Sequence, residues 1–332
     1  MVNQILIGDN PFIGISHLSQ ERAAEEAKAS TDAVMGRVLT AAVDAGATGF
    51  TFTTHPKILS MFRTLAQNGG ADILKRLNYY VLTPYALGYV KQANIGGTVE
   101  LALSVLRGLG SSFFDFEKIP SLFLRRELDP FLKVLPRGRV KAVLLHEILT
   151  EPIIAFRSWS VLQKLSDYVS DEIGASFGIE TRNLGYLHPQ AGNWKIPAEY
   201  IMTPVNPIGY QMAPSRRDCE SAISALGRVA KIIAINTLAS GASSLSEAAA
   251  YLTTMKDSLD AVTTASVSPE RIGGNVRFLL EALHSCALNE FLLEHMSQAD
   301  IEKGDKAVCI LFCHDATINC AMRSECGART SP

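Results

Sequence analysis

Polar residues able to transfer protons or bind metal follow several short apolar runs in this sequence. His17, His55 and His146 each come at or just after such a run, and Glu180 ends another. Histidine titrates near neutral pH, and together with carboxylates it is a frequent ligand of zinc and iron. If the runs are strands of one sheet, these four side chains are candidates for a metal-free acid–base site or for a divalent-metal site.

His146 is the strongest of these candidates, because it follows the fully apolar run Val143-Leu-Leu. Neighbouring strand residues point to opposite faces, so His146 and Glu147 should not both face the same site. Glu180 is therefore the better carboxylate partner for His146. The competing interpretation makes each histidine a cap of a strand end or loop, and makes Glu180 a solvated loop carboxylate.

A candidate anion site lies between Ala261 and Asn275. A short apolar run breaks into small polar residues and is followed by Ser268, a good N-cap, and Pro269, which suits the first helical position. A helix that begins directly after a strand presents free backbone N–H groups and a positive dipole end, both of which favour a phosphate. Arg271 would add a positive charge, or it is an ordinary surface residue of the helix.

The preceding loop, Leu238–Ser246, is rich in small hydroxyl residues. Ser240, Gly241, Ser243 and Ser244 are candidates to bind a phosphate beside the segment after residue 261. A flexible loop that ends in a helix N-cap explains the same composition equally well.

The elements that must position these residues alternate between strand and helix patterns as far as about residue 284. Eight strands in such an alternation predict a parallel (β/α)8 TIM barrel, and barrel enzymes place their chemistry at the carboxyl ends of the strands. An open doubly wound sheet is the alternative, but no Gly-x-Gly-x-x-Gly follows the first strand. The candidate strands are Phe12–Ser16, Thr48–Thr53, Tyr79–Thr83, Val140–His146, Ala175–Ile179, Tyr200–Val205, Ile232–Thr237 and Ala261–Thr264.

Two segments do not fit this count. Ile5–Gly8 is predicted as an extra strand that forms an N-terminal hairpin with the chain after the turn Asp9-Asn-Pro. Residues 113–136 are predicted as an insertion, although Phe113–Phe116 could instead be a ninth strand. Helices are expected at Thr31–Ala45, Gly97–Leu109, Ser158–Ser170, Ser215–Val229 and Ser246–Met255.

Composition narrows the class of protein. The chain has 332 residues, 47% of them hydrophobic, and a net charge of −2 without a basic stripe, which argues against nucleic acid as a partner. No apolar run is long enough to span a membrane, and no signal peptide is evident. Six dispersed cysteines fit a reducing environment, so we expect a cytoplasmic protein. We also expect a small-molecule substrate.

The domain prediction is one barrel over residues 1–290 and a C-terminal extension of uncertain structure over residues 291–332. The extension holds Cys309, Cys313, His314, Cys320 and Cys326, but no Cys-x-x-Cys pair, so a metal site there is disfavoured.

Several of these segments resemble the aldo-keto reductases. Pro11–Ser16 is similar to the family's first strand, and Val143–His146 to its fourth strand, which ends in an active-site histidine. The closest similarity is Ser266–Asn275. In the family this segment holds the adenosine phosphate of NADP, which implies NADP or NAD as cofactor here, with Ser266, Arg271 and Asn275 as its ligands.

The remaining catalytic positions of the family are replaced. Its second-strand aspartate and the tyrosine acid five residues later correspond to Thr51 and Pro56, and the lysine of its third strand to Pro84. Proline has no side-chain proton to donate, so the resemblance implies the fold and a nucleotide site without the usual proton donor. The nicotinamide-anchoring pair is replaced by Glu180 and Thr181.

Three functions therefore stay open. The first is an NAD(P)-binding oxidoreductase with an atypical active site in which His146 is catalytic. The second is a lyase, isomerase or hydrolase that uses strand-end His and Glu residues, with or without a metal. The third is a catalytically silent barrel that binds a ligand.

Overall fold

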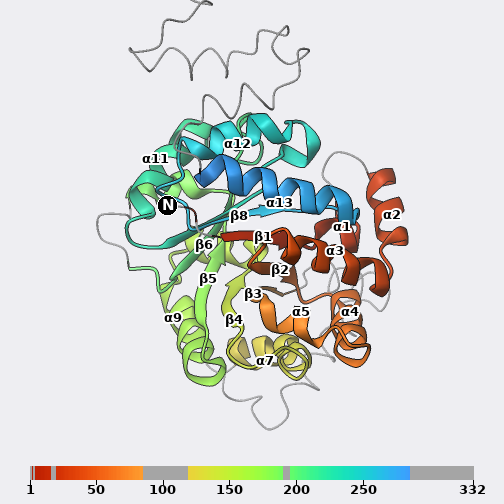
Figure 1. Ribbon diagram of the computed structural model, residues 1–332. Coiled ribbons are helices and arrows are strands. Elements are labelled where there is room, and N and C mark those ends of the chain that lie inside the picture. Colours follow the sequence, from red (N-terminus) through yellow and green to blue (C-terminus); the bar gives the residue numbers. More distant parts are fainter. Residues whose placement is uncertain (1, 3, 16–19, 85–118, 190–194, 285–332) are drawn as a thin grey trace, which may run out of the picture.

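Eight parallel strands close into a barrel in which each strand pairs with its neighbour in the sequence and β8 pairs with β1 (Figure 1). The computed structural model describes residues 2, 4–15, 20–84, 119–189 and 195–284. Helices surround the ring of strands, and α13 packs along α3 as the chain returns to its start (Figure 1). The predicted (β/α)8 barrel is confirmed.

The strands are β1 (Gln4–Gly8), β2 (Gly49–Thr53), β3 (Asn78–Thr83), β4 (Val140–Leu145), β5 (Ser176–Glu180), β6 (Tyr200–Pro204), β7 (Lys231–Ile235) and β8 (Ala261–Thr264). The described helices are α1 (Asn10–Ile13), α2 (Gln20–Ala29), α3 (Asp32–Asp44), α4 (Pro56–Gln67), α5 (Ala71–Arg76), α7 (Ile119–Leu132), α8 (Glu147–Ala155), α9 (Trp159–Tyr168), α10 (Leu184–Leu187), α11 (Arg216–Leu226), α12 (Leu245–Thr253) and α13 (Pro269–His284). A π-helical turn, η2, spans Val169–Ile173, and a 3-10 turn, η4, spans Ala239–Gly241.

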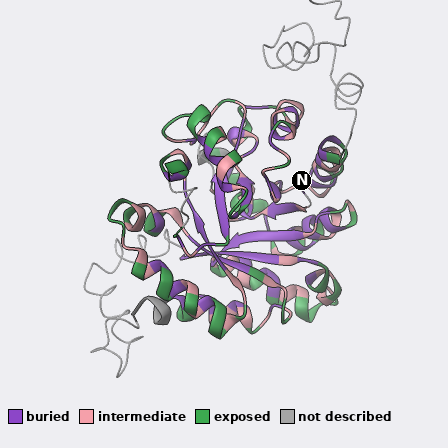
Figure 2. Cartoon of the chain, turned by 90° about the vertical axis from the view of Figure 1, so that its left-hand side faces the viewer, coloured by how far each residue is buried: buried purple, intermediate pink, exposed green. Residues whose placement is uncertain are grey.

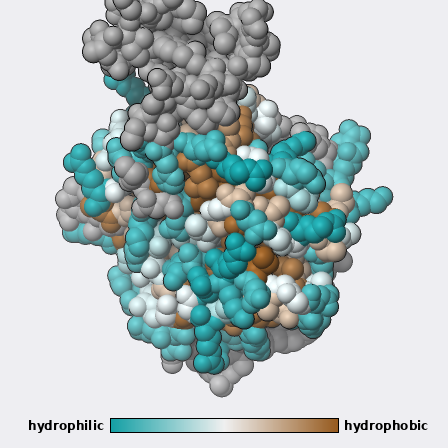
Figure 3. Space-filling model, in the orientation of Figure 1, coloured by the Kyte–Doolittle hydropathy of each residue, from teal (hydrophilic) through white to brown (hydrophobic). Residues whose placement is uncertain are grey.

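The strands are buried on both faces (Figure 2), as expected for a parallel sheet covered by helices. Leu6, Tyr80, Leu144 and Met202 belong to a cluster that fills the barrel interior. The alternate residues face the helices, where Phe50, Phe52, Phe62, Tyr79 and Phe131 form a cluster of aromatic rings. Polar side chains cover much of the outer surface in Figure 3.

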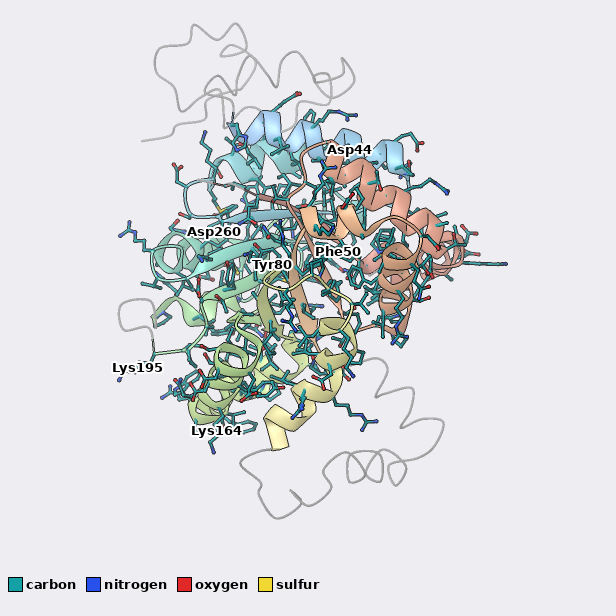
Figure 4. All side chains as sticks on the ribbon, turned by 60° about the horizontal axis from the view of Figure 1, so that its bottom comes forward. Asp44, Phe50, Tyr80, Lys164, Lys195 and Asp260 are labelled. Atoms are coloured by element: carbon teal, nitrogen blue, oxygen red, sulfur yellow. The ribbon has the colours of Figure 1, made fainter. Side chains whose placement is uncertain are left out.

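Polar contacts close the amino-terminal end of the barrel. The hydroxyl of Tyr80 donates to Oε1 of Gln4 at 2.8 Å, and its ring packs edge-on against Tyr200 with ring centroids 5.7 Å apart. Nζ of Lys231 lies 4.8 Å from the centre of the Tyr200 ring. Figure 4 shows Tyr80 near the middle of the ring of strands and Lys195 at its periphery.

The predicted N-terminal hairpin is wrong. Gln4–Gly8 is not an extra strand: it is β1 itself, parallel to both β2 and β8. The stretch predicted as the first strand instead starts with the helix α1. Pro11 decides this, because its fixed φ and missing N–H suit the first turn of a helix, and Phe12 is then buried against the barrel.

The other predicted strands match β2 to β8 within two residues at each end, and β8 matches at both ends. Ser246 is not a cap, because α12 begins one residue earlier and is capped by Ser244, whose hydroxyl and Glu247 form a capping box. The predicted helix Gly97–Leu109, the stretch Phe113–Phe116 and the extension 291–332 lie outside the described residues. Where one domain ends and the extension begins therefore stays a prediction.

Gly178 in β5 occupies a position with no room for a side chain. A Cβ there would lie 2.9 Å from both Cβ and the carbonyl oxygen of Tyr200 on the neighbouring strand. We expect Gly178→Ala to lower the free energy of unfolding by about 1–3 kcal/mol, measured by urea denaturation, because the backbone of two strands must move. Gly274→Ala in α13, where a Cβ meets no atom within 4 Å, is the control. It should keep or raise stability, and equal losses in both variants would contradict this account.

Candidate active site

His146 follows β4 and caps the helix after it. Its backbone is extended, and its Nδ1 accepts the backbone N–H of Ile148 at 3.2 Å. A ring nitrogen that accepts a hydrogen bond carries no proton, so the neutral ring bears its proton on Nε2. Burial lowers the pKa of His146, which favours this neutral form. His146 is thus both a helix cap and a potential Nε2–H donor at the carboxyl end of the barrel.

Glu180 ends β5 and is 7% exposed. Its Oε2 accepts the backbone N–H of Glu147 at 3.2 Å and lies 3.8 Å from Nδ1 of His146. Burial raises the pKa of Glu180 to about 7, against the opposing effects of that N–H and of Arg182. A carboxyl group with such a pKa can gain or lose a proton at neutral pH, as a general acid or base must.

Glu147 does not face Glu180 as a free second carboxylate. It forms an ion pair with Arg182. Burial and the charge of Glu180 raise the pKa of Glu147, whereas Arg182 and His146 lower it. The choice between Glu180 and Glu147 as partner of His146 stays a prediction: Glu180 lies 3.8 Å from Nδ1 of His146, and the charge of Glu147 raises the pKa of His146.

Glu151 of α8 fixes the chain directly after β5. Its Oε1 accepts the hydroxyl of Thr181 at 2.7 Å and the backbone N–H of Arg182 at 3.0 Å, and its Oε2 accepts Nδ2 of Asn183 at 2.6 Å. These three bonds tie α8 to the loop that carries Arg182. They therefore hold the surroundings of Glu180 in place.

Asp9 is an ionisable residue at this end of the barrel that the sequence analysis missed. It follows β1, is 5% exposed, and its Oδ2 accepts both the backbone N–H and the hydroxyl of Thr53 on β2, each at 2.8 Å. Burial raises the pKa of Asp9 to about 6, and the charge of Glu180 contributes to the rise. Asp9 was interpreted as part of a turn. Its position directly after the apolar run Ile5-Leu-Ile was the signal that could have revealed it.

His55 caps α4 and is not brought into a metal site. Its Nδ1 accepts the backbone N–H of Lys57 at 3.0 Å, which supports the capping interpretation. His17 lies outside the described residues. Among the residues that the structure describes, no three His, Cys, Asp or Glu side chains are grouped to hold a metal ion.

The described part of the chain contains no helix long and apolar enough to cross a membrane.

The segment after β8 has the predicted helix start. The hydroxyl of Ser268 accepts the backbone N–H of Arg271 at 3.2 Å, so Ser268 caps α13. Oγ of buried Ser266 accepts the N–H of Ser268 at 3.1 Å, and Nδ2 of Asn275 donates to Oγ1 of Thr264 at 3.3 Å. The side chain of Arg271 is exposed and makes no ion pair within the described residues. Ser266 and Arg271 thus lie at the N-terminus of α13, whereas Asn275 lies further along the helix and contacts the end of β8.

The loop after β7 lies beside this segment, because β7 and β8 are paired. Ala239, Ser240 and Gly241 all have positive φ, a conformation that non-glycine residues rarely adopt. Ser243 is 6% exposed, and its hydroxyl has no hydrogen-bond partner in the described part of the chain. A buried hydroxyl without a partner is uncommon in folded proteins, and Thr83 and Thr203 carry such hydroxyls as well.

Comparison with known proteins supports the fold. No family model and no curated protein matches the chain. A putative 2,5-diketo-D-gluconic acid reductase B is 11% identical, with a TM-score of 0.50 over 88% of this chain and 87% of that one. A Bombyx mori aldo-keto reductase solved in complex with NADP is 14% identical, with a TM-score of 0.47 over 90% and 92%. An aldo-keto reductase from a deep-sea metagenome library is 11% identical, with a TM-score of 0.45 over 92% and 90%.

The fold is a (β/α)8 barrel, shared with the putative 2,5-diketo-D-gluconic acid reductase B. On this barrel, β2 continues to Thr53, so Thr51 lies within the strand, and the residues at the strand end are Thr53 and Thr54. The third strand ends at Thr83, followed by Pro84. The end of β2 therefore has no aspartate, and the end of β3 has no lysine, at the positions where the aldo-keto reductases have them. Buried carboxyl groups at this end of the barrel belong to Asp9, which follows β1, and Glu180, which ends β5, and the hydroxyl of Thr54 after β2 donates to Oε2 of Glu127 in α7.

The raised pKa of Glu180 has a consequence for stability. The folded state binds this proton more tightly than the unfolded state, in which the pKa is near 4.5, so the contribution of Glu180 to stability falls as the pH rises from 4.5 to about 7. In Glu180→Gln this loss is absent. We expect the variant to gain on the order of 3 kcal/mol relative to the wild type between about pH 5 and about pH 8, measured by denaturant unfolding.

Glu199→Gln is the matched control, because Glu199 lies at the opposite end of the barrel and its contact with Lys231 lowers its pKa. That variant should show no relative gain at high pH. A pH-independent difference between Glu180→Gln and the wild type would contradict the assignment.

Proposed function

We propose that this protein is an NAD(P)-dependent oxidoreductase that interconverts a small carbonyl compound and its alcohol. Two observations carry the proposal: the polar residues Ser266, Ser268 and Arg271 at the N-terminus of α13, and the buried hydroxyl of Ser243, which follows the neighbouring strand β7 and has no partner among the described residues. The fold shared with the aldo-keto reductases supports it. Reduced nicotinamide would supply a hydride to the carbonyl carbon.

The residues present fit a phosphorylated cofactor. The exposed guanidinium of Arg271 and the hydroxyl groups of Ser266 and Ser243 are donors suited to phosphate oxygens, and the positive dipole end of α13, a helix of 16 residues, adds to them. Ser240 and Gly241 belong to the adjacent loop, in which Ser240 would contribute its hydroxyl group. Asn275 is close enough to Thr264 to be held in a defined orientation.

The chemistry also needs a proton for the carbonyl oxygen. Pro56 and Pro84 cannot supply it, whereas Glu180 holds a proton near neutral pH because it is buried. His146, neutral with its proton on Nε2, would donate a hydrogen bond to the same oxygen. We therefore assign proton transfer to Glu180 and orientation of the substrate oxygen to His146.

A second function is favoured by the same carboxyl group. A lyase or isomerase that moves a proton without a nicotinamide would also use a buried acid of this kind at the barrel mouth. Cofactor binding separates the two functions, because only the oxidoreductase needs it.

The cofactor site predicts measurable binding. Titration of the full-length protein with NADPH or NADH, followed by nicotinamide fluorescence, should give saturable binding. Arg271→Ala should raise the Kd for NADPH about tenfold, since it removes a charged donor to a phosphate. Arg277→Ala, on an exposed part of the same helix, should leave the Kd unchanged.

Ser243→Ala gives a second measure, because the hydroxyl it removes has no partner in the described residues. The variant should have the same stability as the wild type but bind the cofactor more weakly than the wild type does. No binding of either nicotinamide at millimolar concentration would reject the oxidoreductase and leave the proton-transfer function.

The assignment of Glu180 and His146 predicts the kinetic effects of replacing them. With a panel of aldehydes and ketones as substrates and NADPH oxidation as the readout, Glu180→Gln should lower kcat about 10²–10⁴-fold. His146→Ala should also lower kcat/KM, whereas Glu199→Gln should retain the wild-type rate. A Glu180→Gln variant with normal kcat would rule out Glu180 as the proton donor.

A further inference from the structure

Arg182 is a cationic residue beside Glu180 that the reaction proposed above leaves without a role. It follows Glu180 by two residues, directly after the end of β5. Its Nε forms an ion pair with Oε2 of Glu147, and the backbone N–H of Glu147 donates to Oε2 of Glu180 at 3.2 Å. One residue, Glu147, therefore contacts both Arg182 and Glu180, so the guanidinium group and the proton donor are neighbours.

The charge of Arg182 acts on both residues assigned to the reaction. Burial lowers the pKa of His146, and the positive charge of Arg182 lowers it as well. Burial raises the pKa of Glu180, and the charge of Arg182 opposes this rise. A nearby positive charge disfavours a protonated imidazole and favours an ionised carboxyl group, so both effects agree with a guanidinium group close to the two side chains.

Arg182 is fixed at both ends. Glu151 in α8 accepts its backbone N–H at 3.0 Å and also binds the side chains of Thr181 and Asn183 on either side of it. The ion pair with Glu147 orients the guanidinium end. A donor that is already held in place loses little conformational freedom when a ligand binds to it.

Part of the guanidinium group remains for a ligand. Arginine has five N–H donors, and the contact with Glu147 is made through Nε. The structure shows no hydrogen bond from either terminal nitrogen of Arg182 to another described residue, and the side chain is 34% exposed. Two terminal N–H groups in one plane match the two oxygens of a carboxylate.

The charges around Arg182 are compatible with an anionic ligand. Burial raises the pKa of Glu180 to about 7, so below that pH this carboxyl group is mainly neutral and does not repel a carboxylate. Glu147 balances the charge of Arg182 before a ligand binds. Glu151 is occupied by its three hydrogen bonds to the chain after β5.

We propose that Arg182 determines the class of substrate: its guanidinium group binds the carboxylate of a 2-oxo acid and brings the adjacent carbonyl oxygen to Glu180 and His146. A carboxylate bonded directly to the carbonyl carbon fits this site, because the guanidinium group and the proton donor are neighbours. Binding of the carboxylate is a property of the folded chain, whereas its use in turnover rests on the oxidoreductase proposed above.

The reaction is then the reduction of a 2-oxo acid to a 2-hydroxy acid. The carbonyl carbon accepts a hydride from reduced nicotinamide, and the carbonyl oxygen accepts the proton of Glu180. One C–H and one O–H bond form, the C=O bond becomes single, and the nicotinamide is oxidised. The carboxylate of the substrate is unchanged, and Glu180 regains a proton from solvent before the next turnover.

Calorimetric titration of the full-length protein without cofactor tests the carboxylate site. The probes are 2-oxobutanoate and the neutral, nearly isosteric 2-oxobutanamide. The wild type should bind the oxo acid more tightly than the amide. Arg182→Gln should raise the Kd for 2-oxobutanoate about tenfold or more, since hydrogen bonds to a charged group are lost, and leave the Kd for the amide unchanged.

Arg76→Gln is the matched control. Arg76 is also paired with a carboxylate, that of Asp44 at 3.0 Å, but it lies just before β3 begins, at the opposite end of the barrel. This variant should bind both probes as the wild type does. Urea unfolding of each variant should show a cooperative transition near that of the wild type.

Initial rates of NADPH oxidation give the matching measurement during turnover. Arg182→Gln should lower kcat/KM for 2-oxobutanoate about 10–100-fold and leave kcat/KM for 2-oxobutanamide near the wild-type value. Arg182→Lys should be intermediate for the oxo acid, because lysine keeps the charge without the planar fork. Arg76→Gln should change neither value.

The outcomes separate this proposal from the function on which it rests. Equal affinity of the wild type for the two probes, or an equal effect of Arg182→Gln on both, overturns the role of Arg182 and leaves the oxidoreductase standing. If 2-oxobutanoate binds in a manner that depends on Arg182 but NADPH is neither bound nor oxidised, the carboxylate site stands and the oxidoreductase is rejected.

Discussion

Closure of the sheet between β1 and β8 is the constraint on which the rest of this structure depends. The pairing joins Gln4–Ile7 to Ala261–Thr264, two segments at opposite ends of the described chain. Because all strands are parallel, closure brings every strand's carboxyl end to one mouth. It also places α13 against α3, so the start and the end of the barrel support each other. The ionisable residues therefore meet because the ring closes.

Burial then gives these residues their chemical character. Asp9 and Glu180 are ordinary carboxyl groups whose pKa values rise to about 6 and about 7 because the barrel removes them from water. Hydrogen bonds distinguish the two groups. Thr53 donates two hydrogen bonds to the carboxylate of Asp9, whereas Glu180 accepts one, from the backbone N–H of Glu147. The ion pair of Glu147 with Arg182 and the bonds of Glu151 keep other charged groups of this region occupied.

The comparison with known reductases concerns the barrel and not the residues at the strand ends. The chain shares their barrel at 11% identity in the best-superposed of the structures described above, and at that identity the likeness extends to the fold alone. A barrel tolerates such divergence because its stability comes from the alternation of apolar residues, whereas its chemistry depends on a few strand-end side chains. Here the ends of β2 and β3 carry threonine and proline, and the acidic groups sit on β1 and β5.

The sequence by itself determined the alternation of strands and helices, the bounds of β8 and the cap at Ser268, because periodicity and capping act within a few residues of chain. It did not reveal that the first strand is Gln4–Gly8, since Pro11 suits either a turn or a helix start. Only the tertiary structure decided that Asp9 bonds to Thr53, 44 residues away. Desolvation and contacts between distant residues arise only when the barrel closes, so local pattern cannot encode them.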